Sequence, residues 1–189
     1  MIKTFVLMGM PGCGKGKQAK FLSEKTGFSI YSSGNEYRKI AEGSDFVADK
    51  VRGILDSGDL QPAWLSNFLF QKSLLNLLPG DGIIFEGAGR KEQEARLFAE
   101  VCDWLGRDFR ILHIKVSEAS VSKRLHKRQE IEGRKDDNPS VFQNRIKNFY
   151  EHTAPSIEYF RSINKVIDID GEPLPDVVFA EVWQKVSAL

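Results

Sequence analysis

The sequence lacks the features of a membrane, secreted or metal-centred protein. None of its apolar runs approaches the about 20 residues that a membrane-spanning helix requires. The apolar run near the N-terminus, Phe5–Met8, is too short for the core of a signal peptide. Only two cysteines occur, Cys13 and Cys102, and their spacing supports neither a disulfide nor a zinc site. These absences predict a cytoplasmic protein without a membrane segment.

The sequence also lacks an excess of charge of either sign. The formal net charge of the 189 residues is +1, so we expect no nucleic-acid partner. The three histidines have no spacing typical of a catalytic triad. A hydrophobic fraction of 41% and a charged fraction of 28% are typical of a soluble globular domain. With no repeat or linker in the sequence, we expect one domain and a monomer.

What the sequence does contain is a glycine-rich segment, Gly9–Gly16, with the sequence GMPGCGKG. It follows the apolar run Phe5–Met8 and leads into a predicted helix at residues 15–26. Strand, glycine-rich turn and helix with a lysine in its first turn form the context of a phosphate-binding loop. Glycines let the backbone amides curl around an anion, and the helix N-terminus adds further donors. Lys15 would bring a full positive charge to the terminal phosphates. Gly16 stands where the general motif has Ser or Thr.

Strand-like and helical segments alternate along the rest of the chain. This alternation predicts an α/β fold with a parallel sheet between two layers of helices. Three predicted helices separate the second strand from the third, which suggests a small helical insert beside the sheet. The expected strands lie at residues 5–8, 28–31, 82–86, 109–116 and 165–170.

Arginines follow several of these strands. In parallel α/β sheets, ligands bind beyond the carboxyl ends of the strands. A single arginine on a helix is usually a surface charge, so the prediction depends on their joint placement near one cleft. Arginine matches phosphate oxygens with two parallel hydrogen bonds, and so many arginines suit two phosphorylated ligands. The arginines in question are Arg38, Arg90, Arg124, Arg128, Arg134 and Arg145.

With these motifs in this order, the sequence resembles the adenylate kinase family of nucleoside monophosphate kinases, nearly end to end. In this family a glycine also follows the lysine of the loop, which accounts for Gly16. The segment EGAGR, Glu86–Arg90, matches the family's Asp-Gly-Phe-Pro-Arg stretch incompletely. The other matching segments are Gly9–Gln18 (GMPGCGKGKQ), Ser32–Arg38 (SSGNEYR), Asp56–Leu60 (DSGDL), Arg124–Arg128 (RLHKR), Gly133–Asn138 (GRKDDN), Arg145–Pro155 (RIKNFYEHTAP) and Ile167–Gly171 (IDIDG).

The resemblance implies a P-loop fold of three α/β/α layers with a five-stranded parallel sheet. Its core would comprise residues 1–31, 80–128 and 139–189. A helical insert at about 32–79 would bind the nucleoside monophosphate. A lid at about 129–138 would cover the donor, in the short form that has no room for a zinc knuckle.

The implied reaction is reversible phosphoryl transfer from MgATP to a nucleoside monophosphate, which we predict to be AMP. Mg²⁺ would be held mainly by phosphates and water, with Glu86 reaching it through water. The expected catalytic residues are Lys15, Arg90, Arg134 and Arg145. The expected ATP-binding residues are Gly12, Cys13, Gly14, Lys15, Gly16, Lys17, Arg124, Arg128 and Pro173. The expected AMP-binding residues are Ser33, Arg38, Gly58, Gln61, Gly87, Arg90, Glu94, Arg134 and Arg145.

The chain departs from the family pattern at four places, one of them a pair of residues. Lys17 replaces a threonine, Asn35 an aspartate, and Ala88-Gly89 a Phe-Pro pair. Glu94 replaces the glutamine that reads the acceptor base, with Gln93 one residue earlier. A glutamine amide can donate to adenine N1 and accept from the N6 amino group, whereas an ionised carboxylate only accepts, which suits guanine. Either Gln93 takes over, or Glu94 points elsewhere, or the acceptor is GMP, UMP or CMP rather than AMP.

Two other classes of protein compete with this interpretation. A kinase for a sugar or shikimate-like acceptor would share the loop but need other groups in place of Asp56–Leu60. A catalytically inactive nucleotide-binding relative would explain the departures between Glu86 and Glu94. A GTP-hydrolysing switch is disfavoured because the sequence has no Asn-Lys-x-Asp tetrapeptide.

Overall fold

The computed structural model describes the backbone of residues 2–132 and 139–189, and the side chains of residues 2–125 and 140–189. Within these ranges, five strands form one sheet, and every neighbouring pair is parallel. The order across the sheet is β2-β3-β1-β4-β5, so the predicted five-stranded parallel sheet is confirmed. The strands are β1 (Thr4–Met8), β2 (Ser29–Ser32), β3 (Ile83–Glu86), β4 (Phe109–Lys115) and β5 (Val166–Asp170).

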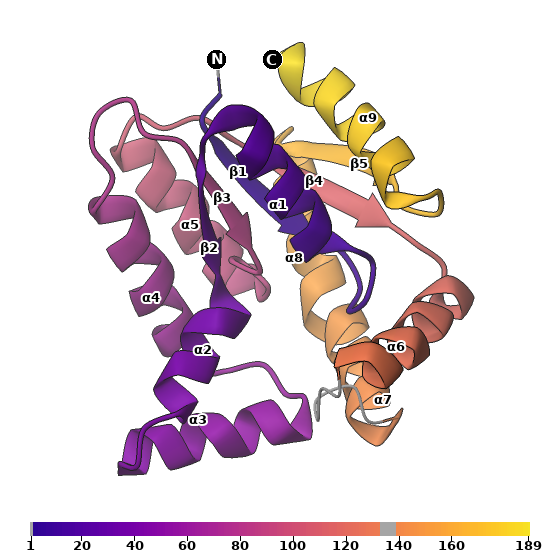
Figure 1. Cartoon of the computed structure of the whole chain (residues 1–189). Coiled ribbons are helices and arrows are strands. Elements are labelled where there is room, and N and C mark those ends of the chain that lie inside the picture. Colours follow the sequence, from indigo (N-terminus) through magenta and orange to yellow (C-terminus); the bar gives the residue numbers. More distant parts are fainter. Residues whose placement is uncertain (1, 133–138) are drawn as a thin grey trace.

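Helices cover both faces of the sheet (Figure 1). On one face α1 (Lys15–Thr26) packs beside α9 (Pro175–Ser187), and on the other α5 (Glu92–Trp104) packs beside α8 (Ala154–Ser162). None of the helices in the described ranges is long and apolar enough to cross a membrane. The remaining helices are α2 (Ser33–Ala41), α3 (Phe46–Ser57), α4 (Ala63–Leu75), α6 (Glu118–Glu132), α7 (Pro139–Asn148) and the π-helix η2 (Phe149–Thr153).

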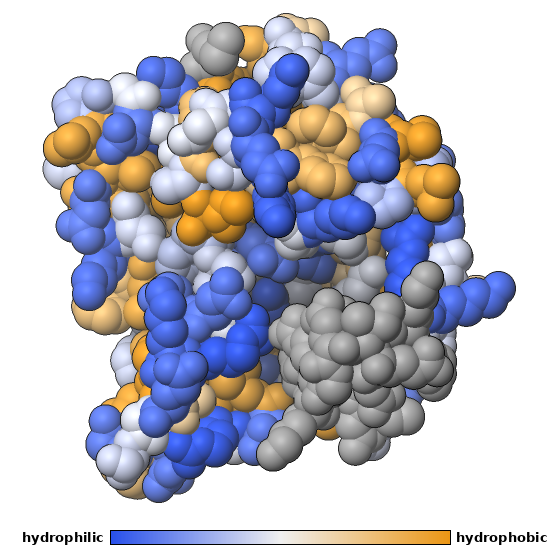
Figure 2. Space-filling model, in the orientation of Figure 1, coloured by the Kyte–Doolittle hydropathy of each residue, from blue (hydrophilic) through white to orange (hydrophobic). Residues whose placement is uncertain are grey.

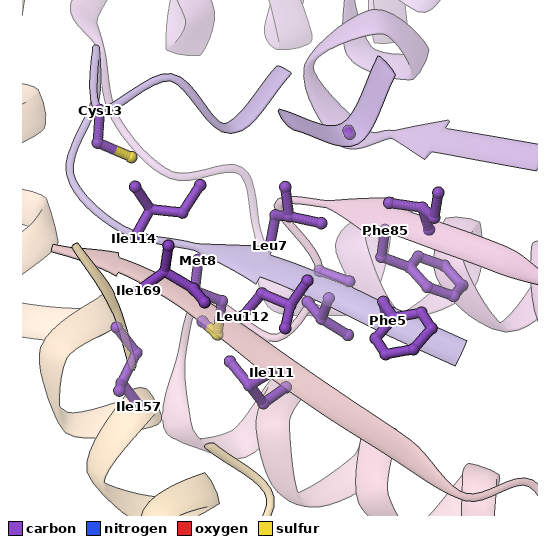
Figure 3. Packing of buried hydrophobic residues seen from close by; sticks show 14 of the residues in the cluster. Phe5, Leu7, Met8, Cys13, Phe85, Ile111, Leu112, Ile114, Ile157 and Ile169 are labelled. Atoms are coloured by element: carbon purple, nitrogen blue, oxygen red, sulfur yellow. The ribbon is translucent and has the colours of Figure 1, made fainter. Parts of the chain in front are cut away.

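The core is built around β1, the central strand. All five of its residues are buried, as expected for a strand covered on both faces. Figure 3 shows its side chains packed against those of β3 and β4. On the α5 side, the ring of Phe98 makes edge-to-face contacts with Phe85, Phe109 and Phe160 at centroid distances of 5.3, 5.3 and 6.4 Å. This aromatic cluster fixes α5 and α8 against the sheet.

Helices α2, α3 and α4 lie between β2 and β3 in the sequence and form the predicted insert. Two of them, α2 and α3, extend away from the sheet in Figure 1, while α4 packs against α5. A small apolar cluster of Tyr37, Val51 and Leu65 joins the three helices. The insert therefore has packing of its own beside the main core.

The sequence predicts a helix carrying Arg145 and another helix starting near Pro155, and α7 and α8 confirm both. The sequence does not predict the π-helical turn η2, through which α7 continues directly into α8. Pro155 has no amide hydrogen for a regular helical bond, and the π-helical turn lies immediately before α8. The three elements form one continuous helical column, as Figure 1 shows.

The parallel arrangement brings the carboxyl ends of the strands to one edge of the sheet. The register pairs Leu7 with Glu86, and Glu86 with Ser32. The glycine-rich loop after β1, the carboxylate at the end of β3 and the start of α2 therefore lie side by side. These are the elements that carry the predicted site.

Candidate active site

A cavity of about 480 Å³ opens at this edge, between the sheet and the insert. Figure 2 shows hydrophilic residues around a hollow on this face of the molecule. Residues from the loop, the insert and the helices after β4 all contribute to the wall. The predicted site residues among them are Gly12, Gly14, Lys15, Gly16, Lys17, Arg38, Gly58, Gln61, Glu86, Gly87, Arg90, Arg124 and Arg145.

The glycine-rich loop turns sharply between β1 and α1. Gly12 has a φ of 83° and Gly14 a φ of 99°, a region that favours glycine. A Cβ atom on Gly12 would lie 2.9 Å from the Cγ atom of Leu125, so α6 also leaves no room for a side chain there. Gly14 is the N-cap of α1, so the free amides of the first helical turn face the cavity. The loop is thus an anion-binding nest at a helix N-terminus.

Lys15 is held inside this loop. Its Nζ atom donates hydrogen bonds to the carbonyl oxygens of Gly9 (2.7 Å) and Met10 (2.8 Å) and lies 3.5 Å from Sγ of Cys13. Burial lowers the pKa of Lys15 below its ordinary value, and the Glu86 carboxylate opposes that shift. The ammonium group is therefore fixed where the loop amides converge.

Glu86 ends β3 opposite the first turn of α1. A Cβ atom on Gly16 would lie 3.4 Å from Oε1 of Glu86, which places the carboxylate against that turn. Across the described residues, no group of three or more His, Cys, Asp or Glu side chains could hold a metal ion. A divalent cation at Glu86 would therefore need most of its ligands from phosphates and water, which is the coordination that Mg²⁺ prefers.

Two arginines face the cavity from the segments after β2 and β3, Arg38 from helix α2 and Arg90 from the turn before α5. Nη2 of Arg38 donates to Oδ1 of Asn35 (2.7 Å). Nη2 of Arg90 approaches Oγ of Ser33 (3.5 Å), and this hydroxyl donates to the carbonyl oxygen of Glu86 (3.3 Å). A side chain on Gly87 would collide with the Arg90 guanidinium. The lack of a Cβ atom at that position therefore lets Arg90 lie across the turn.

Arg124 and Arg145 reach the cavity from the helices after β4. Nη2 of Arg124 donates to the carbonyl oxygens of Gly171 (2.8 Å) and Glu172 (3.0 Å), so Arg124 bridges α6 and the connection between β5 and α9. Pro173 lies in that connection, half-buried, and is not among the lining residues. The side chain of Arg128 and all of Arg134 lie outside the described residues.

Three other predicted residues do not line the cavity. Cys13 is buried beneath the loop, and Ser33 is buried under Arg90. Glu94 is only 2% exposed, and its Oε2 atom accepts hydrogen bonds from the amides of Arg90 (3.0 Å) and Lys91 (3.4 Å). Burial raises the pKa of Glu94. Its carboxylate caps the N-terminus of α5. These contacts fit the alternative in which Glu94 does not contact the acceptor base.

The cavity wall also includes residues that the sequence analysis did not select. Two of them could have been identified from their spacing to predicted residues, since Tyr37 directly precedes Arg38 and Asn148 lies three residues after Arg145 on the same helix face. The others lie within or directly beside the matching segments Asp56–Leu60 and Arg145–Pro155, but no spacing singles them out individually. The main unselected residues are Tyr37, Leu55, Asp59, Asn148, Phe149 and Thr153.

Comparisons with known proteins agree with this geometry. The family model described as "Adenylate kinase" matches residues 7–165. An adenylate kinase of Mycobacterium tuberculosis (strain ATCC 25618 / H37Rv) is 36% identical over 183 residues, which are 96% of this chain and 98% of the relative. Adenylate kinases of Mycolicibacterium paratuberculosis (strain ATCC BAA-968 / K-10) and Mycobacterium leprae (strain TN) are 37% and 38% identical, each over 93% of this chain and 94% of the relative.

Proposed function

Because this chain belongs to the adenylate kinase family, we propose that it transfers the terminal phosphoryl group of MgATP reversibly to AMP, giving two ADP. Membership of this family makes the chain a phosphotransferase. The observation that carries the proposal is the shared cavity, where the anion-binding loop and arginines from four separate elements line one wall. The three relatives described above are adenylate kinases, which favours AMP over other acceptors.

ATP would occupy the loop side of the cavity. The amides of Gly12–Gly16 and the ammonium of Lys15 would hold its phosphates, with Cys13 contributing its backbone and Lys17 a charge in place of a hydroxyl. Arg124 and the Pro173 connection would flank the donor nucleotide, and Arg128 would join them from the same helix as Arg124. This arrangement follows from the contact of Arg124 with the loop carbonyl of Cys13 (3.4 Å) and with Gly171.

The acceptor phosphate would lie between Arg38 and Arg90, beside Ser33 and Gly87. Phosphoryl transfer needs no protein nucleophile, so catalysis depends on positioning and on neutralising the charge of the moving group. Lys15, Arg90 and Arg145 would supply that neutralisation, together with Arg134 from the proposed lid. We propose the domain boundaries predicted from the sequence, with the insert as the acceptor domain.

The acceptor base would lie against Gly58 and Gln61. Gln61 is 3% exposed, and its Nε2 atom donates to the carbonyl oxygen of Val51 (3.0 Å). Within the described part of the chain, its Oε1 atom has no hydrogen-bond partner. Lys91 holds the Gln61 backbone through a 2.9 Å hydrogen bond to its carbonyl oxygen. The unpaired oxygen suits the N6 amino group of adenine, provided that the amide turns towards the cavity when the base enters. Glu94 would then support the site of the acceptor base indirectly, by fixing the start of α5.

Mg²⁺ would be the cation of the reaction, bound with ATP and contacted by Glu86 through water. When bound, Mg²⁺ neutralises charge on the phosphates during transfer. The residues present fit this ion, since the Glu86 carboxylate lies against the first turn after the loop and, among the described residues, no cluster of three or more acidic, His or Cys side chains would replace phosphate and water as ligands. We further propose that the chain acts as a cytoplasmic monomer, as the sequence predicts.

A panel of acceptors tests the function. Purified chain is incubated with MgATP and AMP, IMP, GMP, UMP or CMP, and nucleotide products are separated by chromatography. We expect kcat/KM to be highest for AMP and at least about tenfold lower for IMP, which lacks the N6 amino group. Faster turnover of GMP than of AMP would overturn AMP as the acceptor. Tight ATP binding without transfer to any monophosphate would establish the inactive relative instead.

A further inference from the structure

A hydrogen-bonded cluster joins the insert to α7 on one side of the cavity. Figure 1 shows the C-terminal end of α3 beside α7, and the two helices are in contact. At this point the Asp59 carboxylate accepts hydrogen bonds through Oδ1 from Nδ2 of Asn144 (2.7 Å) and Nδ2 of Asn148 (3.2 Å). Its Oδ2 atom accepts from Oγ of Ser57 (2.8 Å). We call these residues, with Gly58, the Asp59 cluster.

The same two asparagines also hold the backbone of the insert. Nδ2 of Asn144 donates to the carbonyl oxygen of Ser57 (2.9 Å), and Nδ2 of Asn148 donates to that of Gly58 (3.3 Å). Asn144 and Asn148 are four residues apart and so lie on one face of α7. Each asparagine therefore contacts both the carboxylate and the main chain, which fixes the turn between α3 and α4 to this helix.

Gly58 brings the two elements close enough for these bonds to form. Its φ of 78° favours glycine, and a Cβ atom there would lie 2.8 Å from Cγ1 of Val141 and 3.0 Å from Cγ of Arg145. The turn of the insert thus packs directly on the stem of Arg145. Both Gly58 and Arg145 line the cavity, so the position of the insert and that of this arginine are set together.

We propose that Asp59 is a positioning residue that holds the insert against α7, so that the acceptor site and Arg145 are assembled before AMP binds. The expected effect on catalysis rests on the proposed function. Hydrogen bonds from Asn144, Ser57 and Asn148 lower the pKa of Asp59, so the carboxylate stays ionised and continues to accept from all three groups at neutral pH.

Loss of the cluster has a defined kinetic consequence. If the insert spends only a fraction of its time against α7, the apparent affinity for AMP falls to that fraction of its full value. Hydrogen bonds to a charged group are stronger than those between neutral groups, so losing all three is expected to change this population at least about tenfold. ATP binds at the loop, away from Asp59, so its KM is expected to stay the same. At saturating AMP the ligand itself closes the insert, so kcat is retained.

The test compares Asp59→Ala with a matched control, Asp49→Ala. Asp49 lies on α3, the helix that ends two residues before Asp59, but its carboxylate pairs with Arg52 on that helix (2.6 Å) rather than with α7. We expect Asp59→Ala to raise the KM for AMP about tenfold, with the KM for ATP and kcat each within about threefold of the parent, and the control to change none of them. A variant lacking both donors, Asn144→Ala with Asn148→Ala, should reproduce the effect without a further increase when combined with Asp59→Ala.

A distance measurement tests the proposal without relying on turnover. Spin labels are attached at exposed positions 50 on α3 and 143 on α7, and the distance distribution is recorded by pulsed electron resonance without nucleotide. We expect one narrow short distance in the parent and a longer, broader distribution with Asp59→Ala. Identical distributions, or an equal rise in the KM for ATP and AMP, would overturn the proposal. Absence of phosphoryl transfer to AMP would refute the proposed function. It would not affect the distance test, which does not depend on turnover.

Discussion

Lys15 donates a 2.7 Å hydrogen bond from Nζ to the carbonyl oxygen of Gly9, across the loop that separates β1 from α1. A second bond to Met10 fixes the ammonium at the centre of that loop. The charge that would meet the phosphates is therefore already in place and partly desolvated. Little reorganisation is needed when an anion enters, which is how preorganised charges contribute most to phosphoryl transfer.

Lys15→Met should abolish most of the activity. Methionine keeps the apolar stem but loses the charge and the hydrogen bonds to the loop carbonyls. We expect kcat to fall by on the order of 10²–10³-fold, as for the loss of one transition-state donor. Coupled-enzyme assays give the rate and circular dichroism checks the fold. Lys20→Met, an exposed position on the same helix, is the control, and a similar loss there would contradict the assignment.

Gly87→Ala should weaken AMP binding through Arg90. The new methyl group would occupy the space of the Arg90 guanidinium, and the φ of 90° at this position is unfavourable for alanine. We expect the KM for AMP to rise by about tenfold or more, with a smaller effect on ATP, because displaced charge-assisted hydrogen bonds carry about 1.5–3 kcal/mol each. Initial rates at varied AMP measure this. Gly53→Ala is the control, since a Cβ atom there meets no neighbour. An unchanged KM for AMP would exclude Arg90 from the acceptor site.

Glu86→Gln should change the response to Mg²⁺. The amide keeps the shape of the side chain but loses the charge that would hold water on the ion. We expect the Mg²⁺ concentration for half-maximal rate to rise about 10- to 100-fold, the range seen for outer-sphere partners of metals. Removing Mg²⁺ with EDTA should stop the reaction in both proteins. The exposed Glu92→Gln variant is the control, and identical Mg²⁺ curves for all three proteins would argue against a role for Glu86.

His113 should make stability depend on pH below neutrality. Its Nδ1 atom lies 3.0 Å from Oδ1 of Asp168, but burial lowers its pKa below the ordinary value of about 6.5. As the pH falls below about 6.5, the unfolded chain binds a proton that the folded chain does not, so the free energy of unfolding decreases. The slope contributed by one such proton is at most about 1.4 kcal/mol per pH unit.

Urea unfolding between pH 5.5 and 8 measures this effect, with His113→Gln as the comparison. The variant should lose less stability than the parent as the pH is lowered through this window. Asp168 also has a lowered pKa, since hydrogen bonds from Arg161 and His113 outweigh its burial, but that carboxylate titrates at more acidic pH. Parallel stability curves for the two proteins would show that His113 is not responsible.

The fold was largely predictable because its signals are local. The apolar run Phe5–Met8, the glycines after it, and the segments that carry Arg38 and Arg90 are each recognisable from neighbouring residues in the chain. Because parallel sheets bind ligands beyond the carboxyl ends of their strands, these segments were expected to meet at one edge of the sheet. The helix start near Pro155 was predicted, but the π-helical turn that joins α7 to α8 was not, because the sequence has no local signal for such a turn.

The sequence by itself determined the anion-binding loop, the parallel sheet and the charged residues at its edge, since each follows from steric and hydrophobic preferences within a few residues. Only the tertiary structure decided how distant side chains are used. Glu94 caps α5 because the turn at Arg90 presents two amides to it. Asp59 meets Asn144, 85 residues away, because the register of the sheet and the packing of the insert bring α3 to α7. Such contacts depend on the relative placement of whole elements, which no local pattern of residues encodes.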